Sequence, residues 1–243
     1  GEDLSSKTIF IYPEQGLGDA IQFIRYSREL LHMAKRVILE VPRPLARLTN
    51  VPDLATTIIT EGEKITPFDF HATYVDLPVI MGTKSTSIPN QIPYLGTSLF
   101  LKQKFSQILA DYTGKKIGIN WFGNEKNPAD QFRKIPMEEL EPLFKIPGIT
   151  WFSLQKGAQN SKINLPKNTN LVKLQSSPLE QAAGIIQELD LIITSDTAIA
   201  HLAGALGKPV WILLHHAPDW RWLSNGATSK WYPTALLFRQ TKP

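Results

Sequence analysis

The stretch that decides the fold is residues 8–19, which read TIFIYPEQGLGD. Its first part, Thr8–Tyr12, is β-branched or aromatic throughout and is followed by a proline, as in a short buried strand. Glycines at Gly16 and Gly18 allow a tight turn after that strand. Residues 19–34 then carry apolar side chains at helical spacing. A strand, a glycine-containing turn and a helix in this order predict the first unit of an α/β fold.

The same alternation continues along the rest of the chain. Further strands are predicted at Val37–Val41, Ala55–Thr60, Phe68–Tyr74, Lys116–Trp121, Thr150–Leu154, Leu171–Leu174, Leu191–Ser195, Val210–Leu214 and Ala235–Arg239. Helices are predicted at 42–50, Thr97–Tyr112, Met137–Phe144, Pro178–Leu189 and Thr197–Leu206. Gly114 is the expected C-cap of the helix before it. Strands that alternate with helices favour parallel sheets covered by helices on both faces.

The predicted elements fall into two series of similar size. Residues 84–94 interrupt the alternation with Ser, Thr and two prolines, and a second series begins after a boundary near Tyr112–Lys115. A single sheet of about ten strands would be at the upper limit for an open twisted sheet. We therefore predict two Rossmann-like domains with parallel sheets facing a cleft, residues 1–113 and 114–243.

Composition excludes several classes of protein. The 243 residues include no cysteine, which rules out a disulfide scaffold, a zinc finger, a cysteine nucleophile and an iron–sulfur site, and fits a cytoplasmic protein. No apolar run approaches the roughly 20 residues that cross a bilayer, so no transmembrane segment is expected. The net charge of +4 is spread over the chain rather than gathered in a basic tract, so nucleic acid is not an expected partner.

The glycine turn after the first strand is the first candidate binding motif. Gly16 and Gly18 let the backbone approach a ligand, and the following helix start offers free N–H groups. A dinucleotide fingerprint needs glycine or alanine where Ile21 stands, so NAD binding is not indicated. Asp19 is either the helix N-cap, which spacing alone favours, or a carboxylate at the cleft. Gln22 lies on the same helical face and is expected to point at the same ligand.

The second motif, residues 195–201 (SDTAIAH), also follows an apolar strand directly. Asp196 is the expected N-cap of the next helix, and Thr197 and His201 lie one turn apart on one face. Because this helix is built from small residues, Ala198 among them, its start would be a low-profile, electropositive floor suited to a phosphate. The alternative is close helix–sheet packing with a satisfied histidine, and the residues alone leave both open.

Two further segments end strands of the second half, where open α/β sheets bind ligands. Arg133, Lys134 and Lys156 would supply cations for a diphosphate, although each alone is also explained as a solvated surface charge. The binding candidates in these segments are Trp121, Gly123, Asn124, Arg133, Gln155, Lys156 and Gly157.

The aromatic run near the end of the chain is expected to pack against the core, with stacking on a base or sugar as the alternative. It comprises Asp219-Trp220-Arg221-Trp222 and Trp231-Tyr232. His215 and His216 are adjacent, so on a strand they would point to opposite faces and share no metal. The sequence has no Asp-x-Asp pair to hold Mg²⁺ or Mn²⁺ on a nucleotide diphosphate, and we predict no metal site.

Residues 14–23 (EQGLGDAIQF) and 195–210 (SDTAIAHLAGALGKPV) resemble glycosyltransferase family 9, the heptosyltransferase-like family. Residues 153–157 (SLQKG) and 217–222 (APDWRW) look closer still to the glycosyltransferase-like domain of bacterial tetratricopeptide-repeat proteins. The resemblance implies a GT-B-like architecture, with the acceptor mostly on the first domain and the nucleotide sugar mostly on the second. It also implies upstream tetratricopeptide repeats that bind protein.

The same resemblance assigns roles to residues. Asp19 matches the aspartate thought to act as general base, and Asp196, Thr197, Ala198 and His201 match the nucleotide-diphosphate site. Arg133 and Lys156 would offset the charge of the leaving group. The implied activity is an inverting, metal-independent transfer of sugar from a nucleoside-diphosphate sugar to a hydroxyl of a saccharide, lipid-linked glycan or protein, without a cofactor.

Two other functions stay open. One is a non-catalytic module that binds a nucleotide or nucleotide sugar, as a sensor or partner-binding domain. It is favoured because the chain is short for a GT-B enzyme and because the chain ends directly after a strand. A nucleotide-sugar epimerase of the same architecture would use carboxylates and histidine in the cleft.

Overall fold

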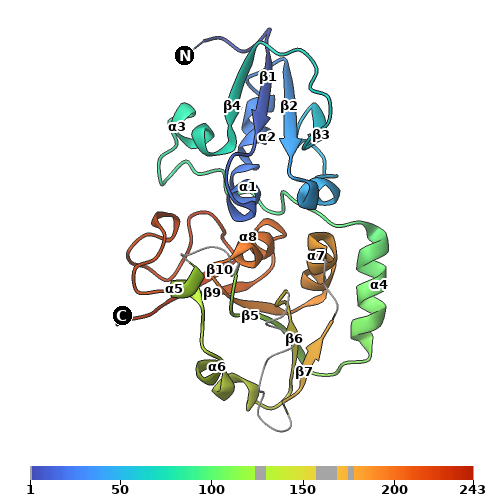
Figure 1. The fold of residues 1–243 in the computed structure, drawn as a ribbon, viewed down its shortest axis with the longest axis vertical. Coiled ribbons are helices and arrows are strands. Elements are labelled where there is room, and N and C mark those ends of the chain that lie inside the picture. Colours follow the sequence, from blue (N-terminus) through green and yellow to red (C-terminus); the bar gives the residue numbers. More distant parts are fainter. Residues whose placement is uncertain (1, 124–129, 157–168, 175–177, 243) are drawn as a thin grey trace.

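The computed structural model describes residues 2–123, 130–156, 169–174 and 178–242 (Figure 1). Its strands form two sheets in which neighbouring strands run parallel. The first sheet has the order β3-β2-β1-β4 and the second β10-β9-β8-β5-β6-β7. The strands are β1 Thr8–Tyr12, β2 Arg36–Val41, β3 Thr57–Thr60, β4 Phe70–Thr73, β5 Lys115–Asn120, β6 Ile149–Ser153, β7 Leu171–Lys173, β8 Leu191–Ser195, β9 Val210–Leu214 and β10 Ala235–Arg239. Each predicted strand is therefore present.

Helices fill the connections between these strands. The α-helices are α1 Leu17–Phe23, α2 Tyr26–Leu31, α3 Leu77–Ile80, α4 Leu99–Ala110, α5 Asp130–Arg133, α6 Met137–Phe144, α7 Leu179–Glu188 and α8 Ala198–Ala205. Three 3₁₀ turns are η1 Arg43–Leu48, η2 Tyr74–Asp76 and η4 Trp220–Trp222. Of these elements, α3, α5, η2 and η4 were not expected from the sequence, since each is only one turn long and carries little periodicity.

The helix predicted over residues 19–34 is in fact two helices. The N–H of Ser27 bonds to the carbonyl of Ile24 at 3.0 Å, in the three-residue spacing of a 3₁₀ turn. The Ser27 hydroxyl also donates to that carbonyl, at 2.8 Å, and so competes with the regular helix ladder. The break places Arg25 between α1 and α2 with its side chain buried.

Three predicted helix caps were wrong. Gly16 is the N-cap of α1, so Asp19 lies inside the first turn, because the helix begins earlier in the glycine turn than its spacing indicated. Thr197, not Asp196, caps α8, and its hydroxyl accepts the N–H of Ile199. Helix α4 ends at Ala110 with Asp111 as C-cap, while Gly114 forms the turn into β5 at a φ of 77°.

The core extends through both halves of the molecule. One cluster of buried apolar side chains includes residues of β1 and β2 as well as β8, β9 and β10. The backbone N–H groups of Tyr94 and Leu95 both donate to the carbonyl of Ala205, so the connection between the sheets is bonded to the end of α8. The two halves are thus packed directly on each other.

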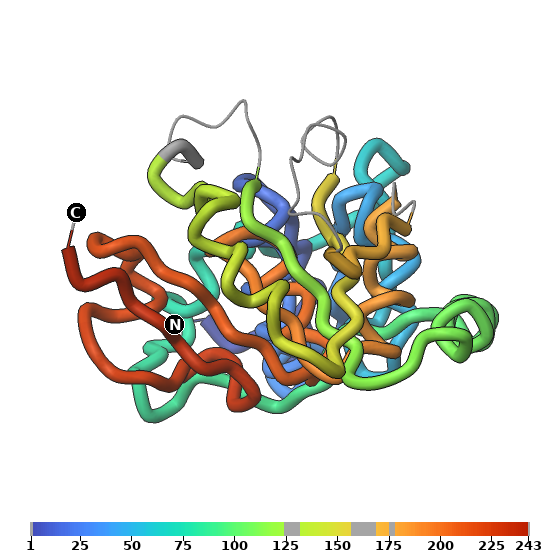
Figure 2. Tube along the Cα trace, turned by 90° about the horizontal axis from the view of Figure 1, so that it is seen from below, coloured from blue at the N-terminus to red at the C-terminus, as the bar shows by residue number. Residues whose placement is uncertain are grey.

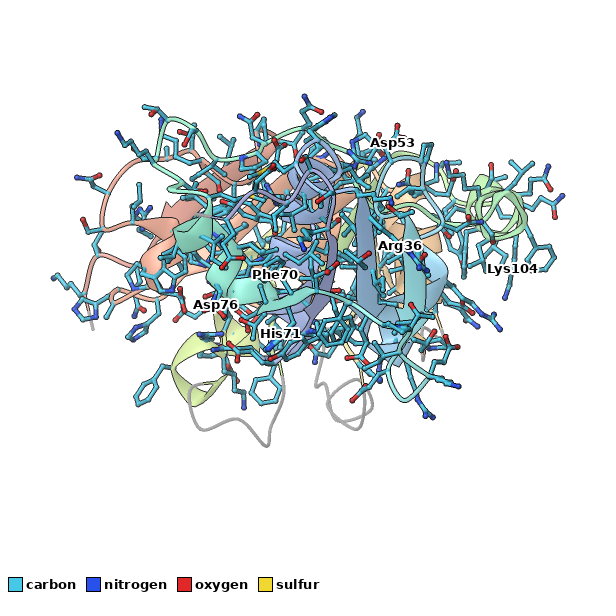
Figure 3. The ribbon with its side chains drawn as sticks, turned by 90° about the horizontal axis from the view of Figure 1, so that it is seen from above. Arg36, Asp53, Phe70, His71, Asp76 and Lys104 are labelled. Carbon is cyan, nitrogen blue, oxygen red and sulfur yellow. The ribbon has the colours of Figure 1, made fainter. Side chains whose placement is uncertain are left out.

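Helix α4 lies beside α7 at the edge of the second sheet (Figure 1). An added Cβ at Gly184 of α7 would lie 2.7 Å from the Phe105 ring of α4, which measures how closely the two helices approach. Figure 2 shows α4 on the opposite side of the molecule from the C-terminal segment. In Figure 3, Lys104 of α4 lies at the margin of the molecule, well away from His71 of the first sheet. The division into two domains, residues 1–113 and 114–243, stays a prediction.

No helix in the described ranges combines the length and apolar character needed to cross a bilayer.

Gly114 and Gly148, which directly precede β5 and β6, give a matched stability test. Gly114 and Gly148 both have a φ of 77°, but a Cβ on Gly114 would lie 2.3 Å from the Gly148 carbonyl oxygen, whereas one on Gly148 meets nothing within 4 Å. That carbonyl also accepts the N–H of Lys115, which keeps it in place. Gly148→Ala should cost about 1–2 kcal/mol from backbone strain alone, and Gly114→Ala about 3 kcal/mol or more. Urea unfolding of both variants checks this, and equal losses would contradict the close approach.

Candidate functional site

The site begins where α1 of the first half meets α8 of the second. A Cβ on Gly18 would lie 3.0 Å from Cδ2 of His201 and 3.9 Å from Cα of Ala198. Glycine suits this approach, since a Cβ at position 18 would make the His201 ring give way by a few tenths of an ångström. Two motifs far apart in the sequence are therefore brought into direct contact, at the ends of β1 and β8.

His201 is enclosed at this contact. Its Nδ1 forms a 2.8 Å hydrogen bond with the Tyr232 hydroxyl, and its ring stacks on Trp222 with centroids 5.4 Å apart. Burial lowers the pKa of His201 well below its ordinary value, and the charges of Arg221, Arg25 and Arg133 lower it further. The ring is consequently neutral at pH 7 and joins the two helices, as in the satisfied-histidine alternative.

Arg221 links the two halves through two of its three side-chain hydrogen bonds to Asp19, Gln22 and Asp219. Its guanidinium donates to Asp19 Oδ1 at 2.7 Å and to Gln22 Oε1 at 2.7 Å, both on α1, and to Asp219 Oδ1 at 2.9 Å. Burial disfavours the charge on Arg221, but the bonds and charges of Asp219 and Asp19 outweigh it and raise the pKa of Arg221. Asp19 and Gln22 thus point at one place, as expected, and Arg221 already occupies it.

Arg133 extends this network toward β8. Its Nε lies 3.8 Å from Asp196 Oδ2 and its Nη2 lies 3.9 Å from Asp219 Oδ2. Burial raises the pKa of Asp196, and the nearby Arg133 charge acts in the opposite direction. Three aspartates and two arginines therefore alternate from α1 to the end of β8.

A cavity of about 380 Å³ opens beside Arg133. Its lining includes Phe132, Arg133, Asp196, His215 and Asp219, which follow β8 and β9 or lie on α5. This volume is within the usual range of small-molecule sites, roughly 300–1,000 Å³. Two sequence-predicted residues, Arg133 and Asp196, therefore line one cavity.

Other predicted binding residues are used inside the protein. The Gln155 side-chain oxygen accepts from Asn120 Nδ2 at 3.0 Å and from the Phe122 N–H at 3.1 Å. The Thr197 hydroxyl donates to Asn120 Oδ1 at 2.9 Å, and Trp121 is buried. These residues fix the ends of β5, β6 and β8 around Asn120, which sequence reasoning missed because a polar residue inside a strand carries no motif.

The remaining candidates lie around this core. Lys156 is exposed after β6, and Gly123 is half-buried after β5. Lys134 extends over the Phe122 ring at 5.7 Å. Asn124 and Gly157 lie outside the described residues.

The turn that carries Arg221 is held by Arg239 of β10. The Arg239 guanidinium donates to the backbone carbonyls of Trp222, Leu223, Asn225 and Gly226 at 2.6–3.1 Å. Sequence reasoning placed Arg221 in a packing cluster and missed its bonds, although two charged residues within an aromatic run were a usable signal.

The rest of that aromatic run is mostly packed, as predicted. Trp222, Trp231 and Tyr232 are buried, whereas Trp220 is exposed. His215 and His216 follow β9 rather than lying on it, so the opposite-face argument does not apply, and their rings lie 5.3 Å apart. Among the described residues no three His, Asp or Glu side chains are grouped as metal ligands.

Known proteins resemble this chain in sequence. The model of glycosyltransferase family 9 (heptosyltransferase) matches residues 160–217. Protein FlbA of Caulobacter vibrioides is 25% identical over 264 residues, which cover 98% of this chain and 44% of FlbA. The chain thus spans less than half the length of that curated relative.

Two solved structures share the architecture. The family 9 glycosyl transferase of Veillonella parvula has a TM-score of 0.70 at 12% identity, covering 98% of this chain and 88% of its own. ADP-heptose LPS heptosyltransferase II of E. coli has a TM-score of 0.62 at 15% identity, covering 95% and 90%. The chain has the fold of the family 9 glycosyltransferases. The expected resemblance to that family and the GT-B-like fold class are confirmed.

The buried His201 at the centre of this family 9 fold predicts acid sensitivity. Below about pH 6.5 the unfolded chain binds a proton at His201 that the folded protein does not. The free energy of unfolding should therefore fall as pH drops from 7, by up to about 1.4 kcal/mol per pH unit, until the folded pKa is reached. Urea unfolding between pH 7.5 and 5 measures this slope.

The variant His201→Gln, which keeps a polar partner for Tyr232, should lose that part of the slope. Replacing the exposed His32 in the same way should leave it unchanged. An identical slope in wild type and His201→Gln would contradict a neutral buried ring.

Proposed function

We propose that this chain is a glycosyltransferase domain that moves a sugar from a nucleoside-diphosphate sugar to an acceptor hydroxyl. The observation that carries the proposal is the junction of α1 and α8. A carboxylate on the first half, Asp19, pairs there with Arg221 of the second half, and Arg221 also pairs with Asp219, which lines the cavity. A junction of this kind can hold an acceptor on the side of the first half and a diphosphate on the side of the second.

The donor is proposed to occupy the cavity beside Arg133. A diphosphate there would exchange the long contacts of Arg133 with Asp196 and Asp219 for charge-assisted bonds to phosphate oxygens. Arginine suits that task because its planar fork can bind two oxygens at once. The start of α8, capped by Thr197, adds backbone N–H groups of favourable polarity.

Asp19 is proposed as the general base. Its carboxylate would take the proton of the acceptor hydroxyl while that oxygen forms a bond to the anomeric carbon. The bond from that carbon to the donor phosphate breaks with inversion, and the nucleoside diphosphate leaves with the electron pair. Arg133 and Arg221 would offset the charge that develops on it, so we propose that the transfer needs no metal ion.

One observation favours the second candidate, a non-catalytic nucleotide-binding module. Oδ1 of Asp19 is held by Arg221 at 2.7 Å, so an acceptor hydroxyl must share or displace that contact. A module that only binds nucleotide would keep the ion pair permanently. Cytoplasmic location and neighbouring tetratricopeptide repeats stay predictions for either function.

Donor binding can be tested by thermal shift with a panel of nucleoside diphosphates and their sugars. A ligand at 100 times its Kd should stabilise the chain by about 2.7 kcal/mol. Arg133→Ala should lose most of this shift. Arg47→Ala removes an equal charge from an exposed side chain and should retain it. If no nucleotide gives a shift, both candidate functions fail.

Catalysis can be tested separately with Asp19→Asn. Release of nucleoside diphosphate from the best-binding nucleotide sugar, in a mixture of saccharide acceptors, should fall roughly 100- to 10,000-fold. The nucleotide-induced thermal shift should remain. Asp53→Asn is the matched control, because Asp53 is exposed and has a φ of 56° that asparagine tolerates.

Unchanged turnover in Asp19→Asn would exclude Asp19 as the base. Turnover absent even in wild type, with nucleotide binding intact, would favour the binding module. Loss of turnover on adding EDTA would contradict metal independence.

A further inference from the structure

We propose that Trp220 is a positioning residue of this domain, a stacking platform for a sugar ring of the acceptor. The inference deepens the proposed function, on which it rests for the role of Asp19. Trp220 differs from its neighbours in one respect: it exposes 62% of its surface, whereas Trp222 and Trp231 expose 1% and 5%.

The exposed indole is held in a fixed orientation. It stacks on Phe23 with the ring planes 13° apart and centroids at 6.4 Å, and Trp231 meets it edge-on at 6.1 Å. The turn that carries Trp220 begins at Asp219, whose carboxylate accepts the N–H of Arg221. A large apolar ring therefore stays exposed while two aromatic neighbours restrict its rotamers.

Trp220 shares a neighbour, Arg221, with the proposed base. Phe23, on which it stacks, is one helical turn after Asp19, so both project from the same face of α1. The neighbouring residue Arg221 bonds to Asp19 and holds its guanidinium 5.7 Å from the Trp220 ring centroid. Arg221 thus contacts both the indole and the carboxylate.

This combination matches the chemistry of a pyranose. A sugar ring presents C–H groups on its faces and hydroxyl groups around its rim. An aromatic ring offers the apolar surface that such a face packs against, while a carboxylate and a guanidinium accept from and donate to the hydroxyls. A flexible lipid chain would instead need an apolar groove, and an extended peptide would need backbone partners.

Gln22 adds an independent polar observation. Its side chain is fully buried and its Oε1 accepts from Arg221, but its Nε2 has no hydrogen-bond partner among the described residues. A buried N–H₂ group without an acceptor is costly. A sugar hydroxyl bound beside Arg221 would provide the oxygen that Gln22 Nε2 lacks as an acceptor.

The test is saturation-transfer NMR of the full chain with methyl glycosides of a hexose, an N-acetylhexosamine and a heptose, and with short oligosaccharides. Wild type should transfer saturation to ring C–H protons of at least one of these probes. Trp220→Ala should weaken its binding roughly tenfold, and Trp220→Phe, which keeps a flat ring, should weaken it less. Trp211→Ala is the matched control, since Trp211 is a second exposed tryptophan, on β9 beside Phe238.

Equal saturation in wild type and Trp220→Ala would overturn the platform, as would the absence of saturation with every probe. The nucleotide thermal shift, run on the same samples, separates the two proposals. A retained shift without saccharide contact rejects Trp220 but leaves donor binding intact. Saccharide contact without any nucleotide shift supports the platform and rejects the transferase.

Discussion

The close contact between α1 and α8 is the constraint on which the rest of the site depends. Because Gly18 has no side chain, the first turn of α1 lies directly against His201, and the carboxylate of Asp19 reaches residues of the other half. A methyl group at this point would crowd the His201 ring. The glycine therefore favours the approach between the helices, rather than backbone freedom alone.

A buried cation supports this contact from behind. Arg25, between α1 and α2, donates to the Tyr94 hydroxyl, to the carbonyl of Trp231 and to the carbonyl of Gln22, and its guanidinium lies over aromatic rings. The bonds join α1 to the C-terminal segment. Full pairing is required because an unpaired buried guanidinium would be strongly unfavourable. Separating the two halves would therefore leave these buried polar groups without partners, at a large cost in free energy.

The sequence was sufficient for the strands but only partly for the site. Apolar runs such as Leu191–Ser195 are local patterns, and all of the predicted ones form strands. Helix caps were less predictable. Asp19 and Asp196 are both residue types that favour an N-cap, but Gly16 caps α1 and Thr197 caps α8. Arg221 could not be found from spacing, because its partners Asp19 and Gln22 are about 200 residues away and are met only after folding.

The alternation of aspartates and arginines keeps two arginines close together without an anion bound. Arg133 and Arg221 would repel each other if they were unpaired, and Asp219 lies between them, within 4 Å of both. Asp219 also caps the turn that presents Trp220, so one carboxylate contacts both cations and holds the turn of the proposed platform. An arriving diphosphate would compete with Asp219 for Arg133, whose contact at 3.9 Å is long, rather than for Arg221, whose contact at 2.9 Å is short. On this ordering a donor, if the proposed function holds, would take Arg133 first, while Arg221 would keep its contact with Asp19.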